Sequence, residues 1–280
     1  MDSEKEFLAR YDLSKYDRPS VTADVAAFMI ASQERDSYRK NPENQLQLLL
    51  IKRGGHPYKG MWALPGGFLQ RGETIEQCAV REFFEETNVQ PVSVMPVGVF
   101  SEPERDPRGW IISNAYASVI SEESVKQVGS DDAADAQWFC VSFERTESDE
   151  YHLTLTYEEV TLHAVLAAEH THFGRTSFRI IDCGGLAFDH AAIIAAALSA
   201  LRAEAKNYDA IFDFLPETFT LSALQKVLET IMNVTVLPAN FRRTIRKYVE
   251  ETDEYLRGEG HRPARLYRRK TVPQMSKQRS

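Results

Sequence analysis

Short apolar runs separated by polar stretches fill much of the first half of the chain, and this pattern predicts strands joined by loops. The strand-like runs lie at residues 21–30, 46–51, 97–100, 111–120 and 138–141. Residues 54–67 are rich in glycine and proline and predict a loop. Residues 151–165 alternate loosely between apolar and polar positions, which suits an added hairpin, although residues 163–170 also suit a helix.

Helical spacing of apolar residues marks segment 74–87 and three later segments, at 191–206, 220–231 and from Pro238 onward. The pair Gly184–Gly185 precedes the later helices, so we expect a domain boundary near residues 183–189. The last helix is two-faced. Its apolar side holds Phe241, Ile245, Tyr248 and Val249, and its basic side holds Arg242, Arg243, Arg246 and Lys247.

Composition places this pattern in a globular protein without a membrane span. The chain has 280 residues, 43% of them hydrophobic and 26% charged, which is comfortable for two domains. The start is acidic and unlike a signal peptide, and the longest apolar run, 191–201, is too short to cross a bilayer. The three scattered cysteines suit buried thiols in a reducing compartment. We therefore expect a cytoplasmic protein with no membrane partner.

The distribution of charge separates an acidic first part of the chain from a basic C-terminal segment. The net charge is −8, but residues 237–280 hold twelve Lys/Arg against five Asp/Glu and carry +7, so the preceding residues carry −15. A basic end is often only a solvated surface. Here the basic helix follows another helix and precedes a basic segment divided by Gly258 and Gly260, an order that predicts a winged helix-turn-helix.

Helix 74–87 carries the candidate chemistry. Thr74 and Gln77 have capping-box spacing, and Glu82, Glu85 and Glu86 fall within an arc of about 100° on one face. Like charges four residues apart repel, and carboxylates in the last turns oppose the helix dipole. A hard divalent cation with oxygen ligands would relieve both costs. The alternative for three glutamates alone is a solvated acidic face.

The stretch from Gly67 to Val89 resembles the Nudix box, and eight positions match in register: Gly67, Glu73, Arg81, Glu82, Phe83, Glu85, Glu86 and Val89. The resemblance implies that Glu82, Glu85 and Glu86 bind Mg²⁺ or Mn²⁺, with Glu73 nearby and Arg81 orienting a carboxylate. The closing glycine of the box is replaced by Asn88, which tolerates the left-handed conformation next best. A further carboxylate of loop 129–135 is a candidate ligand or base, or part of a polar turn.

Two neighbouring stretches, 52–66 and 103–110, resemble the ADP-ribose pyrophosphatase-like branch of that family. Arginines there could hold a diphosphate by bidentate contacts. Trp62, Tyr58 or Trp110 could stack on adenine, or these aromatic residues could have a structural role instead. The implied substrate-binding residues are Arg53, Trp62, Gly66, Gly67, Arg105 and Arg108. The preferred substrate is ADP-ribose, cleaved to AMP and ribose 5-phosphate.

The whole chain is similar to the Nudix-related transcriptional regulators of NAD metabolism, the NrtR type, through segments 186–190, 215–221, 240–243 and 262–267. Only residues from about 143 to 180 look like an insertion. The resemblance implies DNA binding, for which the candidate residues are Asn240, Arg242, Arg243, Arg246 and Arg262. It also implies a homodimer, and His190 is expected to pack or cap at the linker.

Together these observations predict an α+β protein. A Nudix α/β/α sandwich with a mixed sheet is expected at 1–185, a winged helix-turn-helix domain at 186–273 and a tail at 274–280. Three functions stay open: an active hydrolase of a nucleoside diphosphate derivative, a DNA-binding repressor that uses the Nudix fold as a sensor, and a structural or adaptor protein. Catalysis ranks first because every box carboxylate is present, and a bifunctional protein is compatible with both basic and acidic regions.

Overall fold

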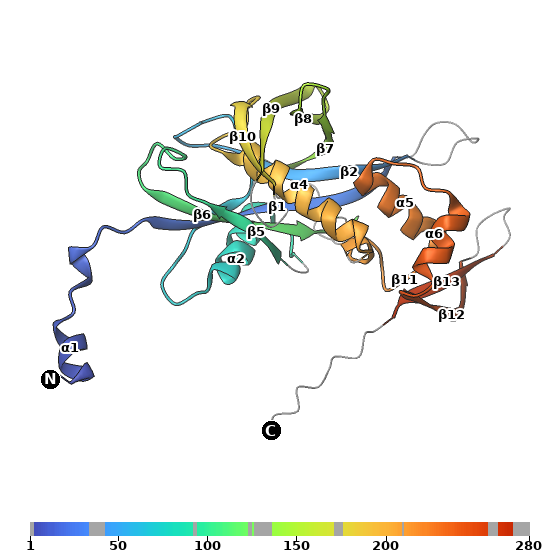
Figure 1. Ribbon diagram of the computed structural model, residues 1–280, viewed down its shortest axis with the longest axis horizontal. Helices are drawn as coiled ribbons and strands as arrows, with labels where there is room; N and C mark the ends of the chain where they lie inside the picture. The colour runs from blue at the N-terminus through green and yellow to red at the C-terminus, as the bar shows by residue number, and fades with distance from the viewer. Residues whose placement is uncertain are drawn as a thin grey trace.

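The structure, a computed structural model, describes residues 3–33, 43–91, 94–122, 125, 136–170, 176–208, 210–256 and 263–270. A large sheet forms the centre of the molecule (Figure 1), with main order β10-β9-β8-β7-β2-β1-β6-β5. The short strands β3 and β4 pair with β2 and β1. The bounds are β1 Ser20–Gln33, β2 Glu43–Lys52, β3 Trp62–Ala63, β4 Gly66–Phe68, β5 Val94–Phe100, β6 Ile111–Val119, β7 Ala136–Arg145, β8 Glu150–Tyr157, β9 Val160–His170 and β10 Thr176–Asp182.

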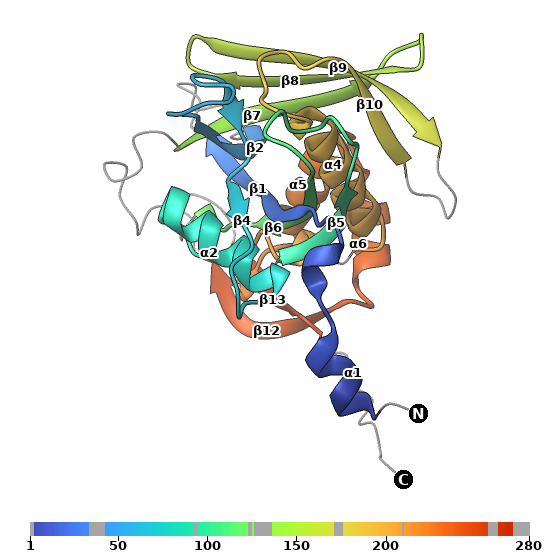
Figure 2. The same cartoon turned by 90° about the vertical axis from the view of Figure 1, so that its left-hand side faces the viewer.

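Helices cover both faces of this sheet. Helix α2 (Ile75–Thr87) packs through Cys78, Ala79 and Phe83 on a core that includes Val25 and Leu49. Helix α4 (His190–Lys206) lies on the opposite face (Figure 2), where the larger apolar core continues from the sheet into the C-terminal helices. β1 pairs parallel with β6 and antiparallel with β2, so the sheet is mixed. The predicted α/β/α sandwich is confirmed.

The suspected insertion extends the sheet. β7, β8, β9 and β10 pair antiparallel in sequence order, and a tight turn at Glu158 joins β8 to β9. The hairpin alternative is therefore the right one, and residues 163–170 form a strand rather than a helix. Cross-strand pairing such as Leu155↔Leu162 buries apolar side chains on one face, which a helix at this position would not provide.

A small winged helix-turn-helix ends the described chain. It comprises the 3-10 turn Ala210–Phe212, helix α5 (Leu221–Met232), helix α6 (Pro238–Ile245) and a three-stranded sheet of β11 (Thr218–Phe219), β12 (Val249–Leu256) and β13 (Ala264–Arg269). Pro238 opens α6 as predicted. The helix is shorter than expected, however, because Val249 pairs with Arg269 and starts β12. Tyr248 and Val249 therefore do not extend the apolar face of α6.

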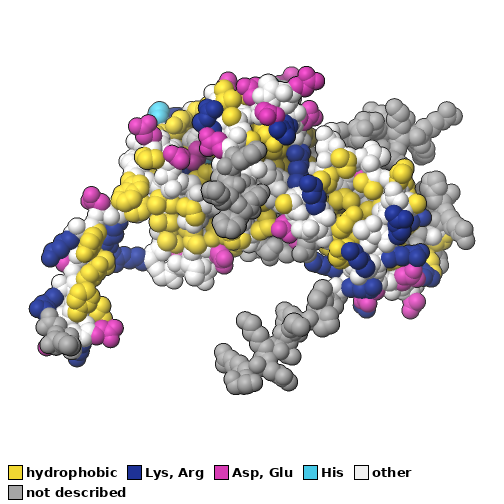
Figure 3. Space-filling view, in the orientation of Figure 1, with side chains coloured by type: hydrophobic (Ala, Val, Ile, Leu, Met, Phe, Trp, Pro, Cys, Tyr) yellow, Lys and Arg dark blue, Asp and Glu magenta, His cyan; other side chains and the backbone are white. Residues whose placement is uncertain are grey.

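An N-terminal arm projects away from the body (Figure 1). It holds α1 (Glu4–Arg10) and the 3-10 turn Leu13–Lys15, and none of the residues in either element is buried. Apolar side chains such as Phe7 and Tyr16 lie exposed along it (Figure 3). Within the described residues, none of the helices has the length and apolar character needed to cross a membrane.

Candidate ligand site and nucleic-acid interface

Local sequence signals set both ends of α2. The Thr74 hydroxyl accepts a hydrogen bond from the Gln77 amide, and the Gln77 side chain accepts one from the Thr74 amide, so the predicted capping box is present. Asn88 ends the helix with φ 55° and ψ 13°, and its N–H donates to the Phe84 carbonyl at 2.8 Å. Asparagine thus takes the left-handed position of the expected glycine.

Two glycines of β4 allow the box helix to approach the sheet closely. A Cβ on Gly67 would lie 2.2 Å from Glu82 Oε2, and a Cβ on Gly66 would lie 2.2 Å from the Ala23 carbonyl oxygen. The Gly66 N–H donates to Glu86 Oε2 at 2.8 Å. Of the two glycines that the sequence assigned to substrate binding, Gly66 therefore binds Glu86 through its N–H, and Gly67 leaves room for the Glu82 carboxylate.

Arg81 is the centre of an ion-pair network on α2. It donates to both carboxylate oxygens of Glu73, at 2.7 and 3.0 Å, and to Glu82 at 2.7 Å, and it lies 3.4 Å from Glu85. The hydrogen bonds from Arg81 lower the pKa of Glu73 to about 2. The sequence predicted contact with a carboxylate; the structure shows one guanidinium shared by three.

Glu86 is the box carboxylate that the network leaves out. Removal of water by the surrounding chain raises the pKa of Glu86 to about 7, and the nearby charges of Glu82 and Asp24 act in the same direction. The carboxyl group thus carries an unfavourable negative charge near neutral pH. A bound cation would stabilise that charge, which fits the oxygen-donor chemistry predicted for this face.

The three glutamates nevertheless do not form a preassembled cage. Within the described residues, no group of three or more His, Cys, Asp or Glu side chains has an arrangement that could hold a metal ion. The reason is that Glu82 turns to Arg81 and Gly67, Glu86 turns to Gly66, and the side chain of Glu85 is 58% exposed. The candidate carboxylates of loop 129–135 lie outside the described residues.

A small cavity of about 130 Å³ lies beside the glycines, between the sheet and the start of α4. Its wall includes three arginines, one residue of the linker before α4 (residues 183–189) and the first residue of α4: Arg53, Arg105, Arg108, Phe188 and His190. Arg53 and Arg108 both lie over the Phe188 ring, with guanidinium carbons 4.8 and 5.4 Å from its centre. The arginines predicted to bind a diphosphate are therefore brought together.

The linker supplies charged partners to this cavity that sequence reasoning missed. Arg105, with a side chain 3% exposed, donates to both carboxylate oxygens of Asp189 at 2.8 and 2.6 Å. Arg105 also lies 3.8 Å from Asp24, whose carboxyl pKa is raised by burial. Arg108 is held instead by Asp106 at 2.7 Å. No local motif joins residues 105 and 189, so only the fold could reveal this pair.

His190 is buried as the sequence suggested. Its Nδ1 accepts a hydrogen bond from the Leu64 N–H at 2.8 Å, which requires the ring nitrogen to be unprotonated. Burial lowers the pKa of His190 to about 4, so the ring is neutral at physiological pH. It therefore joins the first turn of α4 to the loop that precedes Gly66.

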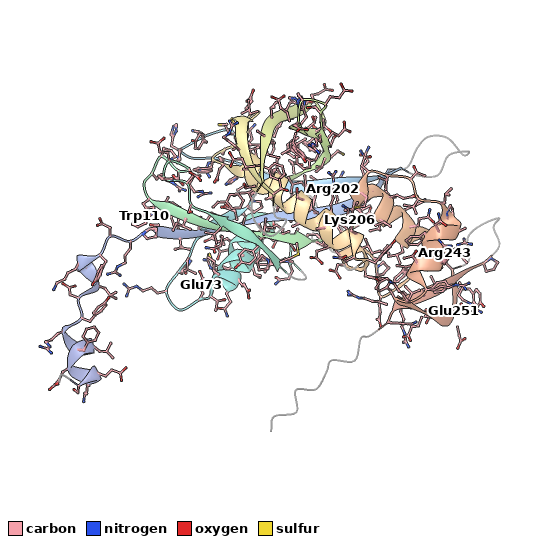
Figure 4. All side chains as sticks on the ribbon, viewed as in Figure 1. Glu73, Trp110, Arg202, Lys206, Arg243 and Glu251 are labelled. Atoms are coloured by element: carbon pink, nitrogen blue, oxygen red, sulfur yellow. The ribbon has the colours of Figure 1, made fainter. Side chains whose placement is uncertain are left out.

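The aromatic candidates fall into different environments. Trp62 belongs to the core, where its ring meets Phe139 edge-on at 4.8 Å, so the structural alternative is favoured over adenine stacking. Tyr58 packs on Phe188 at 4.8 Å. Trp110 is 52% exposed and lies on the sheet side of the molecule, together with Glu73 and away from Arg243 (Figure 4). Tyr58 is thus the aromatic nearest the cavity wall.

The winged helix carries the second candidate surface. Asn240, Arg242, Arg243 and Arg246 are all exposed, on α6 or at its end. The wing is less basic than its sequence suggested, because Arg265 contacts Glu251 and Arg268 contacts Glu250 across β12 and β13. Arg262 lies outside the described residues. Exposed arginines without a glutamate partner among the described residues therefore lie on α6 and at its end, where Figure 3 shows dark blue side chains.

Comparison with known proteins agrees with this architecture. Residues 36–155 match the NUDIX domain family and residues 211–269 match the NrtR DNA-binding winged helix domain family. A Nudix domain joined to a winged helix is the class that the fold and the site define. The chain is 30% identical over 270 residues to the ADPR responsive transcriptional repressor NtrR of Acinetobacter baylyi, spanning 95% of this chain and 88% of that protein.

Two further similarities frame the assignment. Over 138 residues, 48% of this chain and 72% of that protein, the chain is 38% identical to the ADP-ribose pyrophosphatase of Methanocaldococcus jannaschii. The crystal structure of a MutT/nudix family protein from Enterococcus faecalis superposes with a TM-score of 0.71 at 31% identity, covering 96% of this chain and 94% of that one. The chain belongs to the NrtR-type family of Nudix-related transcriptional regulators.

Proposed function

We propose that this protein is a DNA-binding regulator whose Nudix domain binds ADP-ribose or a close nucleoside diphosphate. The observation that carries the proposal is that Phe188 of the linker and His190, the first residue of α4, both line the arginine cavity, and that α4 contacts helix α5 of the winged helix. The full-length similarity to an ADPR responsive repressor supports it and moves regulation ahead of catalysis, which the sequence ranked first.

Each proposed activity has its own residues. Arg53 and Arg108 face the cavity and suit an anionic diphosphate, since guanidinium groups match phosphate geometry. Exposed Arg242 and Arg243 on α6 suit the DNA backbone and bases. We also propose that the protein acts as a homodimer, the arrangement implied by the family resemblance, and sedimentation of the purified chain tests this.

Hydrolysis of the same ligand is a second candidate, favoured by the complete set of box carboxylates. Glu82, Glu85 and Glu86 would hold Mg²⁺ or Mn²⁺ once Glu82 leaves Arg81. The cation would neutralise phosphate charge and lower the pKa of an attacking water. Arg81 keeps Glu73 ionised and positions Glu82, and Gly66 orients Glu86. The similarity to an ADP-ribose pyrophosphatase supports this candidate.

One pair of measurements tests both. Calorimetry should show that ADP-ribose binds the full chain, and chromatography of the same mixture with Mg²⁺ should show whether AMP forms. Binding without AMP assigns the Nudix domain to sensing, and binding with AMP assigns it to both tasks. If neither ADP-ribose nor a panel of other nucleoside diphosphates bound, the proposed function would be wrong.

A further inference from the structure

Helix α4 begins at an aspartate that does not cap it. Asp189 occupies the N-cap position of this long helix, yet it makes no side-chain cap hydrogen bond. Aspartate is among the strongest N-cap residues because its carboxylate accepts hydrogen bonds from the free N–H groups of the first turn. The Asp189 carboxylate is instead engaged by Arg105. It therefore has two possible partners, and the structure shows one of them.

The Arg105–Asp189 pair has the geometry of an arginine–phosphate contact. Nε and Nη2 of Arg105 donate to the two carboxylate oxygens at 2.8 and 2.6 Å, the fork arrangement that guanidinium groups also make with phosphate. Arg105 lines the cavity together with Arg53 and Arg108. The linker carboxylate thus occupies, on Arg105, the position that an oxyanion of a ligand would take.

The linker also limits the size of the cavity. Sites for ligands of drug size measure roughly 300–1,000 Å³, whereas this cavity measures about 130 Å³. Phe188, held with a φ of 52°, stacks under Arg53 and Arg108 and closes one side. Backbone hydrogen bonds attach the preceding residues to β3, with the Ala187 N–H donating to the Trp62 carbonyl at 2.8 Å. A larger ligand must therefore displace the segment that starts at Phe188.

We propose that Asp189 is an internal competitor for the anion site, and that a phosphate of the ligand replaces its carboxylate on Arg105. Released Asp189 then caps the first turn of α4. The inference rests on the proposed function, because it requires a nucleoside diphosphate in this cavity. Helix α4 contacts α5, and Arg202 of α4 donates to the Ile231 carbonyl of α5 at 3.2 Å, so a shift at Asp189 reaches the winged helix.

The test compares ADP-ribose affinity in the full-length wild type and in Asp189→Asn, measured by calorimetry without divalent metal so that no turnover occurs. Removing the competitor should tighten binding about tenfold, because the site is no longer closed by the linker. Asp182→Asn is the matched control, since Asp182 ends β10 just before the linker and its carboxylate accepts a hydrogen bond from the Gly184 N–H. Its affinity should equal that of the wild type.

If the Asp189 carboxylate had a purely structural role, Asp189→Asn would leave ADP-ribose affinity unchanged or weaken it. Equal or weaker ADP-ribose binding by a folded Asp189→Asn protein, with normal wild-type binding, would overturn this inference and leave the proposed function standing. Absence of binding by the wild type would overturn both. Without ligand, Asp189→Asn should also shift DNA affinity in the direction in which ADP-ribose shifts it in the wild type.

Two further measurements protect the test against a misfolded variant. Asp189→Ser removes the charge but supplies a good cap, so it should bind ADP-ribose at least as tightly as Asp189→Asn. In the wild type, hydrogen exchange of the first-turn amides of α4 should slow when ADP-ribose binds, because Asp189 then caps them. Unchanged or faster exchange at these amides in the ligand complex would contradict the exchange of partners.

Discussion

The box helix α2 and the winged helix both bring like charges close together, but the two regions neutralise these charges in different ways. Arg81 of α2 forms ion pairs with Glu73, Glu82 and Glu85, while the pKa of Glu86 is raised to about 7. In the wing, Glu251 and Glu250 of β12 each form an ion pair with one arginine of β13, Arg265 and Arg268 respectively. The comparison shows that the number of charged residues in the sequence overstates the charge that can bind a partner, because the fold pairs many of these residues with one another. Among the described residues of these two regions, Glu86 and the exposed Arg242, Arg243 and Arg246 have no ion pair, so we expect these charges to meet a partner.

The largest effect should come from the carboxylate face. If the chain hydrolyses ADP-ribose, Glu86→Gln should lower Mg²⁺-dependent AMP release by about two orders of magnitude, because it removes the unpaired charge from the cation site. Chromatographic AMP quantification checks this. Glu76→Gln, an exposed glutamate in the first turn of the same helix, is the control and should retain full activity. Equal losses of AMP release in both variants would contradict the assignment of the cation site to the carboxylates at the end of α2.

The arginines allow the same distinction to be tested with DNA. The double change Arg242→Ala and Arg243→Ala should weaken DNA binding and reduce the slope of log affinity against log salt by about two, since two phosphate contacts disappear. Arg265→Ala with Arg268→Ala should change the slope less, because both side chains already contact glutamates. A fluorescence titration over a salt series measures both. A reversed order would show that the wing is the main contact.

The buried junction around His190 adds a pH dependence of its own. His190 has a pKa lowered by burial to about 4, below its ordinary 6.5, so its contribution to stability is complete above pH 6.5 and is lost as pH falls toward 4. The loss should be on the order of 3 kcal/mol. Asp24, with a raised pKa and 3.8 Å from His190, contributes in the opposite direction. The free energy of unfolding should therefore be compared between the wild type and His190→Gln across this range. Parallel curves would contradict the assignment.

The smallest effect concerns the end of α2. Asn88→Gly should stabilise the protein by no more than about 1 kcal/mol, because glycine adopts the left-handed conformation without strain. Asn88→Ala at the same position should destabilise it. Thermal melting of the three proteins gives the order directly, and a less stable Asn88→Gly would mean that the Asn88 side chain makes a contribution beyond its backbone shape.

Sequence reasoning succeeded where the signals were local. Thr74 and Gln77 lie at the start of one helix, so their spacing predicted the capping box, and the resemblance to the Nudix box predicted the left-handed Asn88 at its end. The alternation in residues 151–165 likewise predicted the hairpin. The two domains and the family resemblance followed from such motifs, and both are confirmed.

It failed where distant segments meet. The helical pattern of α6 continues past Ile245, but pairing of Val249 with Arg269 in the sheet ends the helix earlier. Arg105 and Asp189 are separated by 84 residues, and no local motif joins them. Trp62 was assigned to the substrate, yet its ring packs in the core; the assignment of Arg105 to the ligand stays a prediction. Tertiary packing decided all three cases.

The most direct test of the central claim is a DNA-binding titration of the full-length protein with and without saturating ADP-ribose, in one buffer at one salt concentration. If the cavity and the winged helix are coupled through the linker, ADP-ribose should change the DNA dissociation constant by about fivefold or more. An identical dissociation constant in both titrations, with ADP-ribose binding verified on the same sample, would contradict the account.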